Sequence, residues 1–153
     1  MGRTYFYILF FTLLTFGACN EPDRGEEALA LYDEIVNEGI GNVTNSLERV
    51  DSAEQAGVFT VVQANTVRAT IYEHAGQRRM AEYYAEEAIA AEQGHAIATS
   101  ADSAFYCMAR YILADGAYTN GEFGKSLTLS QELLAFVGNG TSAKDLAMKC
   151  RAL

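Results

Sequence analysis

The sequence predicts an all-α fold in which antiparallel helix-turn-helix pairs stack side by side. Apolar residues recur at steps of three and four along the chain, which is the spacing of one helix face, and the period-two alternation of strands is missing. Glycines divide the apolar segments into pieces of helix length. Two of these pieces follow a glycine and share a pattern of small residues, which indicates an internal repeat.

The composition places the chain among single-domain globular proteins. Its 153 residues include one proline and are 50% hydrophobic, which is enough for one modest core and argues against disorder. Acidic residues outnumber basic ones by 20 to 11, and the net charge is −9. Because nucleic-acid binding needs a clustered positive surface, we expect no nucleic-acid partner.

Residues 1–18 have the features of an export signal. Arg3 precedes a twelve-residue stretch, residues 5–16, that only two threonines interrupt. Since a helix rises about 1.5 Å per residue, this stretch is too short to cross a hydrocarbon layer of ~30 Å. The small residues Gly17 and Ala18 and then Cys19 follow it. A secretory signal cleaved at another position and a short N-terminal anchor are the alternatives.

The small residues before Cys19 resemble the end of a bacterial lipoprotein signal, apart from Phe16, where leucine is usual. This resemblance implies that Cys19 becomes the mature N-terminus and carries a lipid such as palmitate. The protein would then be anchored to a bacterial envelope membrane, in the periplasm or at the cell surface. Residues 19–27 contain the single proline, a glycine and four acidic residues, and we expect them to form a flexible tether.

The mature chain is expected to form helices that glycines and loops separate. Glycines are predicted to end the first three helices, because glycine adopts the left-handed cap conformation without strain. These are Gly39 with Gly41, then Gly57, then Gly76. Thr60 is the predicted N-cap of the third helix. The expected helical segments are 26–37, 43–56, 60–75, 80–89, 104–113, 123–137 and 143–150.

The segment 80–89 has the widest apolar face. Apolar or small residues occur there as pairs every fourth position, which predicts that more than one neighbouring helix covers this segment. The segment 104–113 has the same spacing. The paired residues are Met80, Ala81, Tyr84, Ala85, Ala88 and Ile89 in the first segment and Ala104, Phe105, Met108, Ala109, Ile112 and Leu113 in the second.

The internal repeat is centred on Gly76 and Gly121, which lie 45 residues apart. A small residue follows each glycine by five positions, and an apolar pair follows it by twelve and thirteen positions. An alanine precedes each glycine by seven positions. Small residues in the middle of a helix allow a neighbouring helix to approach closely, so we expect these positions at helix–helix contacts.

At these positions the chain resembles tetratricopeptide-repeat (TPR) proteins, over about residues 42–150. The matching residues are Ala69, Tyr72, Gly76, Ala81 and Ala88 in one copy and, in part, Ala114, Gly121, Phe123 and Ser126 in the other. The spacing of 45 residues departs from the usual period of about 34, and the terminal proline of the family is absent. The resemblance implies a TPR-like α-solenoid, or superhelix, over residues 28–153, whose concave groove binds a protein or peptide.

The lipoprotein-type leader, followed by residues 50–57 and 71–89, also resembles the extracytoplasmic helical-repeat regions of Bacteroidetes signalling proteins. In such proteins the repeats often precede a membrane helix and a histidine kinase or a DNA-binding output domain. The apolar stripe of residues 143–150 has no cap glycine after it, so we expect the repeat domain to be truncated at its C-terminus. Fraying of a terminal helix is the alternative.

Three tyrosines are candidates for contacts with a partner. Tyr83, Tyr106 and Tyr111 fall off the apolar stripes of their helices. Tyrosine is favoured at interfaces because it combines a large contact area with a polar tip. These side chains either line the concave groove or cover helix edges.

The sequence contains no catalytic or metal-binding arrangement that we recognise. His74 and His95 have no second histidine or cysteine at metal-ligand spacing, so we expect both on the surface, with no metal and no cofactor. Cys107 and Cys150 are expected as thiols in the core, and a disulfide between them is the alternative in an exported protein. No histidine lies at a spacing that would activate either thiol, so we expect no enzymatic activity.

The expected function is that of a lipid-anchored, extracytoplasmic protein–protein interaction module, the sensory region of a longer two-component-type signalling protein. The alternative is a stand-alone cell-envelope lipoprotein that serves as a scaffold or binds nutrients such as glycans. A membrane helix and an output domain encoded downstream would favour the first function.

Overall fold

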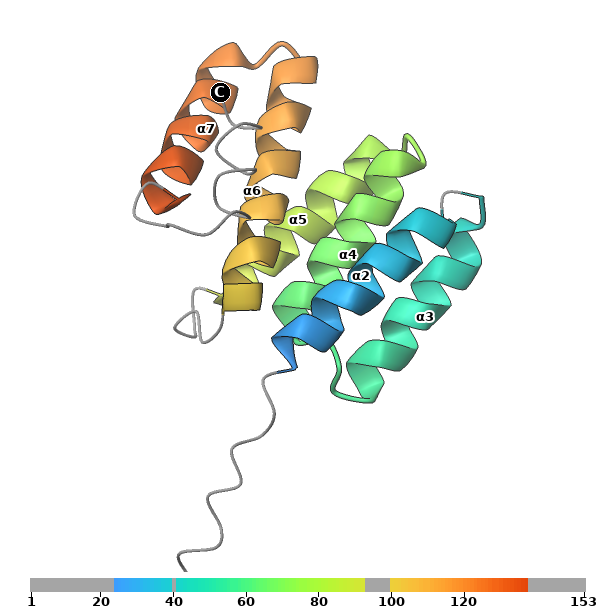
Figure 1. Ribbon diagram of the computed structural model, residues 1–153. Helices are drawn as coiled ribbons and strands as arrows, with labels where there is room; N and C mark the ends of the chain where they lie inside the picture. Colours follow the sequence, from blue (N-terminus) through green and yellow to red (C-terminus); the bar gives the residue numbers. More distant parts are fainter. Residues whose placement is uncertain (1–23, 40, 93–99, 138–153) are drawn as a thin grey trace, which may run out of the picture.

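The structure, a computed structural model, describes residues 24–39, 41–92 and 100–137. Within these ranges all regular secondary structure is helical, which confirms the all-α prediction. The helices are α2 (Gly25–Gly39), α3 (Val43–Gln55), α4 (Val61–His74), α5 (Arg78–Glu92), α6 (Ser100–Thr119) and α7 (Phe123–Val137), as labelled in Figure 1. The expected helix 143–150 lies outside the described residues, as do Cys19, His95 and Cys150.

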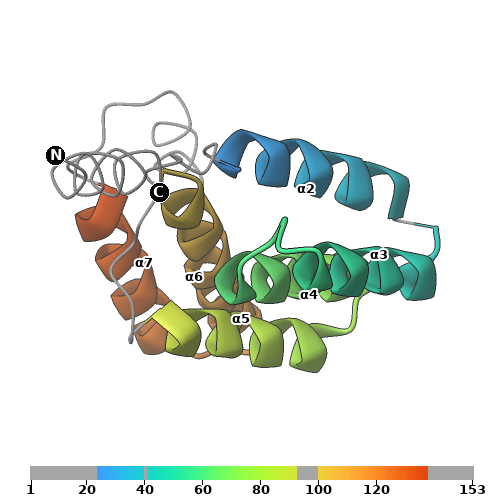
Figure 2. The same cartoon turned by 90° about the horizontal axis from the view of Figure 1, so that it is seen from below.

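The helices form three antiparallel pairs, α2–α3, α4–α5 and α6–α7 (Figure 1). Helix α4 is central and contacts α2, α3, α5 and α6. Figure 2 shows α2 and α5 on opposite sides of α4. Helix α6 contacts α2, α4, α5 and its own partner α7. The first helices of the three pairs, α2, α4 and α6, therefore all touch one another.

Three glycines end helices in the same left-handed conformation. Among the described residues these are the ones with positive φ: Gly57 (+70°), Gly76 (+69°) and Gly121 (+79°). In each case the residue after the glycine donates its backbone N–H to the carbonyl oxygen five residues earlier, as in the Schellman motif. These bonds are Val58 to Ala53, Gln77 to Tyr72 and Glu122 to Ala117, at 2.8–2.9 Å. The predicted caps at Gly57 and Gly76 are confirmed, whereas the prediction for Gly41 is wrong, because its φ is not positive.

The predicted N-cap at Thr60 is confirmed. Its Oγ1 accepts a hydrogen bond from the backbone N–H of Gln63 (3.3 Å), and the Thr60 N–H donates to Gln63 Oε1 (3.0 Å). This reciprocal capping box satisfies two N–H groups at the start of α4. Gln63 Nε2 also donates to Asp102 Oδ1 (2.8 Å) on α6. The cap of α4 thereby also fixes the start of α6 beside it.

The start of α2 differs from the expected tether. Helix α2 begins at Gly25, one residue before the predicted helix 26–37, so residues 25–27 at the end of the expected tether are helical. Arg24 Nη1 donates a hydrogen bond to the carbonyl oxygen of Gly57 (2.9 Å). This bond holds the residue before α2 against the loop between α3 and α4. Acidic residues in the first turn of α2, Glu26 and Glu27, suit the positive end of the helix dipole.

The larger core cluster has Phe105 of α6 at its centre. The Phe105 ring makes edge-on contacts with the rings of Tyr32 (5.6 Å between centroids) and Phe59 (6.2 Å). One buried side chain thus joins α2, α6 and the loop before α4. The fully or largely buried members are Ala28, Ile35, Val36, Val50, Ala53, Phe59, Ala64, Val67, Ile71, Phe105 and Met108.

A second, alanine-rich cluster joins α4, α5 and α6. Its buried members are Ala69, Ala81, Ala85, Ala88, Ala109 and Ile112. Because α4 and α6 both contact α5, the prediction that more than one helix covers the segment 80–89 is confirmed. Met80 does not take part in this cluster and is 37% exposed. It lies in the first turn of α5, beyond the buried alanines.

The Gly76 and Gly121 copies share the same packing at several repeat positions. Ala69 and its counterpart Ala114 are both buried, and so are Ala88 and its counterpart Leu133. The small residue five positions after Gly121 is Ser126, whose Oγ donates to the Ala114 carbonyl oxygen (2.8 Å). Phe123 differs from the other repeat positions. It is 63% exposed and touches the ring of Tyr118 (5.6 Å).

Arg68 fixes α3 against α4. Its Nη2 donates to Asp51 Oδ1 and to Glu54 Oε2, both at 2.6 Å. Burial disfavours the charge of Arg68, but the two carboxylates outweigh burial, and the pKa of the guanidinium is raised above its ordinary value. The ion pairs therefore persist over the whole pH range in which the carboxylates are charged.

Candidate binding groove

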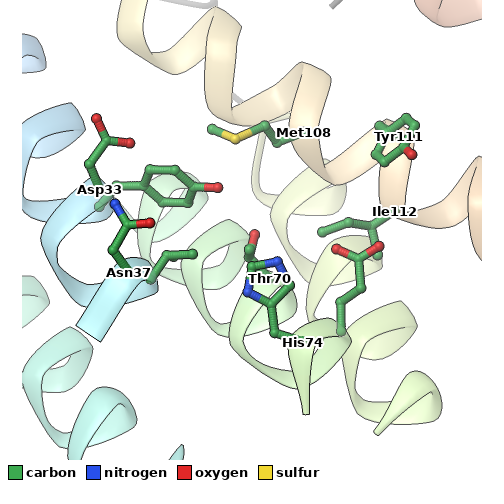
Figure 3. Close-up of a pocket in the computed structure, with 10 residues that line it drawn as sticks. Asp33, Asn37, Thr70, His74, Met108, Tyr111 and Ile112 are labelled. Carbon is green, nitrogen blue, oxygen red and sulfur yellow. The ribbon is translucent and has the colours of Figure 1, made fainter. Parts of the chain in front are cut away.

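A cavity of about 630 Å³ opens on the side of the molecule formed by the three first helices. Figure 3 shows side chains of α2, α4 and α6 around this space. Each helix contributes one face: four residues from α2, three from α4 and three from α6. They are Tyr32, Asp33, Val36 and Asn37, then Thr70, Glu73 and His74, then Met108, Tyr111 and Ile112. We call this cavity the groove. Helices α3, α5 and α7 contribute no described residue to it.

Helical spacing explains how each helix lines the groove. On each helix the lining residues are separated by one, three, four or five positions, so they fall on one side of that helix. Tyr32 of α2 lines the groove, and its ring contacts the Phe105 ring of α6. From there the groove extends toward the C-terminal ends of α2 and α4, where Asn37 and His74 lie in the last turns.

The groove is acidic. Asp33 from α2 and Glu73 from α4 contribute carboxylates, and His74 is the one basic side chain among the described lining residues. The C-terminal turns of α2 and α4 add partial negative charge, because their last carbonyl groups point out of the helix end. Val36, Met108 and Ile112 supply apolar wall. The groove therefore combines carboxylate groups with aliphatic surface.

A second, smaller cavity of about 220 Å³ adjoins the groove and shares Glu73 and Ile112 with it. Glu82 and Asp115 add two carboxylates there, against one guanidinium, that of Arg78. Negative charge thus continues from the groove toward the contact between α5 and α6.

Gly116 of α6 makes room for the Glu82 carboxylate. A Cβ atom at Gly116 would lie 2.6 Å from Glu82 Oε1. Glu82 Oε1 also accepts a hydrogen bond from Asn120 Nδ2 (3.2 Å). The glycine thus lets a charged side chain of α5 lie directly over α6, next to the groove.

The three tyrosines proposed from the sequence have different positions. Tyr111 lines the groove. Tyr83 is 51% exposed on α5, packs edge-on against Tyr84 and lines neither cavity. Tyr106, for which the sequence left the groove and a helix edge open, does not line the groove. Tyr106 is only 7% exposed, because Phe136 of α7 covers its ring (5.1 Å) and the guanidinium of Arg110 lies over it (4.9 Å).

Several groove residues have no individual signal in the sequence. His74 is exposed, as predicted, but its position at the groove was not foreseen. Met108 belongs to the paired apolar positions of the segment 104–113, and Tyr32 lies in the predicted helix 26–37. Asp33, Asn37 and Glu73 read as ordinary polar residues of a helix surface. Their common location depends on how α2, α4 and α6 meet, which local spacing does not contain.

The groove offers carboxylates, phenol groups, an imidazole and aliphatic surface. Within the described ranges, no group of three histidine, cysteine or acidic side chains is arranged to hold a metal ion. Cys107 is buried in a small cluster with Leu133 and Tyr111, in agreement with its predicted place in the core. A search of the same ranges finds no helix with the length and apolarity that a membrane crossing requires.

Comparisons of this chain with protein-family models, with curated proteins and with solved structures gave no match.

Proposed function

We propose that the three helix pairs form a TPR-like stack and that its groove binds a peptide segment or a helix of a partner protein. The observation that supports this proposal best is the lining of the groove. All described lining residues come from α2, α4 and α6, the first helices of the pairs. In a stack of helix pairs, the first helices form one continuous side, and a recessed side of this kind accepts an extended ligand.

The dimensions of the groove suit such a ligand. A volume of about 630 Å³ falls in the range of ligand-binding clefts. The aromatic and aliphatic walls supply contact area, and the polar groups between them give orientation. The helices beneath the groove are held by Phe105 and by the alanine-rich cluster, so the surface is formed before a ligand arrives.

Filling the groove is expected to abolish peptide binding. Asn37 is exposed and lines the groove, so Asn37→Trp places a bulky ring in it without removing a core contact. Peptides selected from a random display library on the purified protein should bind Asn37→Trp at least tenfold more weakly than the original protein. Fluorescence anisotropy measures the Kd.

The matched control is Asn45→Trp. Asn45 is also exposed, but it lies on α3, which does not line the groove. This variant should bind the selected peptides with unchanged Kd. Equal binding by both tryptophan variants would contradict the proposal, and so would a library that yields no binding peptide.

We further propose that Cys19 carries a lipid that holds this module at the outer side of a membrane, where it serves as the sensory region of a signalling protein. The leader resembling a lipoprotein signal supports the anchor, and the resemblance to extracytoplasmic repeat regions supports the sensory role. Cys19→Ala is expected to move the protein from the membrane fraction to the soluble fraction and to abolish palmitate labelling. Cys150→Ala is the control and should leave both unchanged. Retention of Cys19→Ala in the membrane fraction would refute the lipid anchor.

A further inference from the structure

We infer that residues 143–150 form a helix that packs along α7 and covers one side of it, which we call the α7 stripe. The α7 stripe consists of Leu127, Ser130 and Leu134, which follow one another at steps of three and four. The inference goes beyond the proposed function, because the groove contains no described residue of α7. It follows from the contacts of α7, the exposure of the stripe and the sequence after α7.

Helix α7 has the fewest neighbours among the described helices. It packs only on α6, whereas each of the other described helices contacts at least two. Figure 1 shows α7 at the edge of the arrangement, next to α6. The second helix of each earlier pair contacts the first helix of the following pair: α3 contacts α4, and α5 contacts α6. By the same rule, one more helix would pack against α7.

The α7 stripe is separate from the face of α7 that packs on α6. That face includes Leu133, which is 1% exposed and packs with Cys107 of α6. Leu127 is 60% exposed, and Ser130 and Leu134 are partly exposed. Covering an exposed leucine with apolar surface is favourable, because it removes that area from water. The stripe is therefore a surface on which an amphipathic helix can pack.

The sequence after α7 has the complementary pattern. Residues 143–150 lie outside the described residues, and their apolar positions share one side of a helix. These positions are Ala143, Leu146, Ala147 and Cys150. A helix of this length is marginal in water by itself, so it needs a surface to pack on.

The short connection keeps this segment close to α7. The five residues 138–142 separate the two, and the loop 56–60 between α3 and α4 has the same length. Since an extended chain spans at most about 3.6 Å per residue, five residues bridge no more than about 18 Å. Helices joined by connections of this length are typically antiparallel neighbours. We therefore expect the segment to run back along α7.

The length of the segment sets how far it reaches. At about 1.5 Å per residue, an eight-residue helix that starts beside the end of α7 covers roughly half of the 15 residues of α7. Cys150 would then lie beside the turn that contains Leu127 and Ser130. Phe123, one turn before Leu127, stays outside this contact.

Charge and tethering favour this occupant over a second copy of the chain. Residues 143–151 contain three basic side chains, Lys144, Lys149 and Arg151, against one acidic side chain, Asp145. The whole chain has 20 acidic and 11 basic residues, so the segment is attracted to the rest of the protein. A short linker holds a tethered segment at an effective concentration of about millimolar, well above that of a second copy in dilute solution.

The test is a disulfide between α7 and Cys150. The full chain carries Cys19→Ala in every variant, which leaves Cys150 and the buried Cys107 as native thiols. Leu127→Cys and Ser130→Cys each place a thiol on the stripe. A disulfide forms only where the two Cα atoms come within about 7 Å of each other. With oxidised glutathione as the oxidant, at least one of these two variants should form an intrachain disulfide with Cys150, which mass spectrometry of the crosslinked peptide identifies.

The matched control on α7 is Gln131→Cys. Gln131 is exposed and follows Ser130 directly, so its side chain lies on another side of the helix. The disulfide with Cys150 should form at least tenfold faster in the better stripe variant than in Gln131→Cys. Equal rates would overturn the inference, because the segment would then not be held on the stripe. The absence of this disulfide from both stripe variants would overturn it as well.

A second comparison tests the apolar side of the segment. Leu146→Asp, added to the better stripe variant, should slow formation of the disulfide at least tenfold, because the contact would bury a carboxylate. Met148→Asp is the control, since it adds the same charge off the apolar side of the segment. This control should change the rate by less than twofold. An equal effect of the two substitutions would contradict the inference.

The same assay distinguishes the segment from a second copy of the chain. A disulfide within one chain forms at a rate that does not depend on protein concentration, and this result supports the inference. Disulfides between two chains run as a dimer on a gel without reductant, and they increase with protein concentration. Their predominance would overturn the inference. Neither result depends on peptide binding by the groove, so the inference and the proposed function are tested separately.

Discussion

Replacing Phe105 with alanine is expected to lower the free energy of unfolding by about 3–5 kcal/mol, the cost typical of a buried phenylalanine. Phe105 is fully buried, and its ring contacts the rings of Tyr32 and Phe59. The alanine variant would leave a space among α2, α4 and α6 that these stiff helices can close only in part. Urea unfolding followed by circular dichroism measures the loss.

The matched control for this prediction is Phe123→Ala. Phe123 is 63% exposed, so its removal should change the free energy of unfolding by less than about 0.5 kcal/mol. If both alanine variants lost the same stability, Phe105 would not be the centre of the larger core cluster.

Enlarging Ala81 to leucine is expected to destabilise the fold by about 1–3 kcal/mol through overpacking. Ala81 is almost fully buried in the alanine-rich cluster, where α4 and α6 both pack on α5. The added carbon atoms would force α5 away from a neighbour or drive the leucine out of a favoured rotamer. The midpoint and slope of urea unfolding give the change.

Ala90→Leu on the same helix is the control for Ala81→Leu. Ala90 is exposed, so the same enlargement should be tolerated there within about 0.5 kcal/mol. A stable Ala81→Leu variant would show that the positions aligned through Gly76 and Gly121 do not mark close helix contacts.

Local sequence patterns predicted the helices and their turns well. The step of three and four placed five helices within three residues of their observed bounds, whereas α6 (Ser100–Thr119) extends well beyond the predicted segment 104–113 at both ends. The glycine spacing located the turns at Gly57, Gly76 and Gly121. These features depend on residues only a few positions apart. The buried alanines of α5 were also predicted, because their doubled spacing requires two neighbouring helices.

The groove could not be predicted, because it depends on contacts between distant segments. In the alignment through Gly76 and Gly121, residues 70–74 of α4 correspond to residues 115–119 of α6. The groove instead brings residues 70–74 together with residues 108–112. Helix α6 is longer than α4, with 20 residues against 14, and it reaches α2 through Phe105. The internal repeat therefore predicts the helices but not how they are placed relative to one another.

The burial of Tyr106 has the same origin. Tyr106 lies off the apolar stripe of its own helix, so the residue spacing along α6 predicts that its side chain faces solvent. Arg110, one turn further along α6, pairs with Glu132 of α7 and lies over the Tyr106 ring. A residue that looks polar on one helix is thus buried by the next one.

Tyr111 links the groove to the packing of α7 on α6. It lines the groove, and it also packs against the small cluster of Cys107 and Leu133 that holds α7 to α6. A ligand that fixes the Tyr111 ring would favour the packing of α7 on α6. A change that loosens α7 would in turn weaken the binding of the ligand. Thermodynamic linkage makes these two effects equal in free energy, so this one ring would couple ligand binding in the groove to the packing of the last described helix.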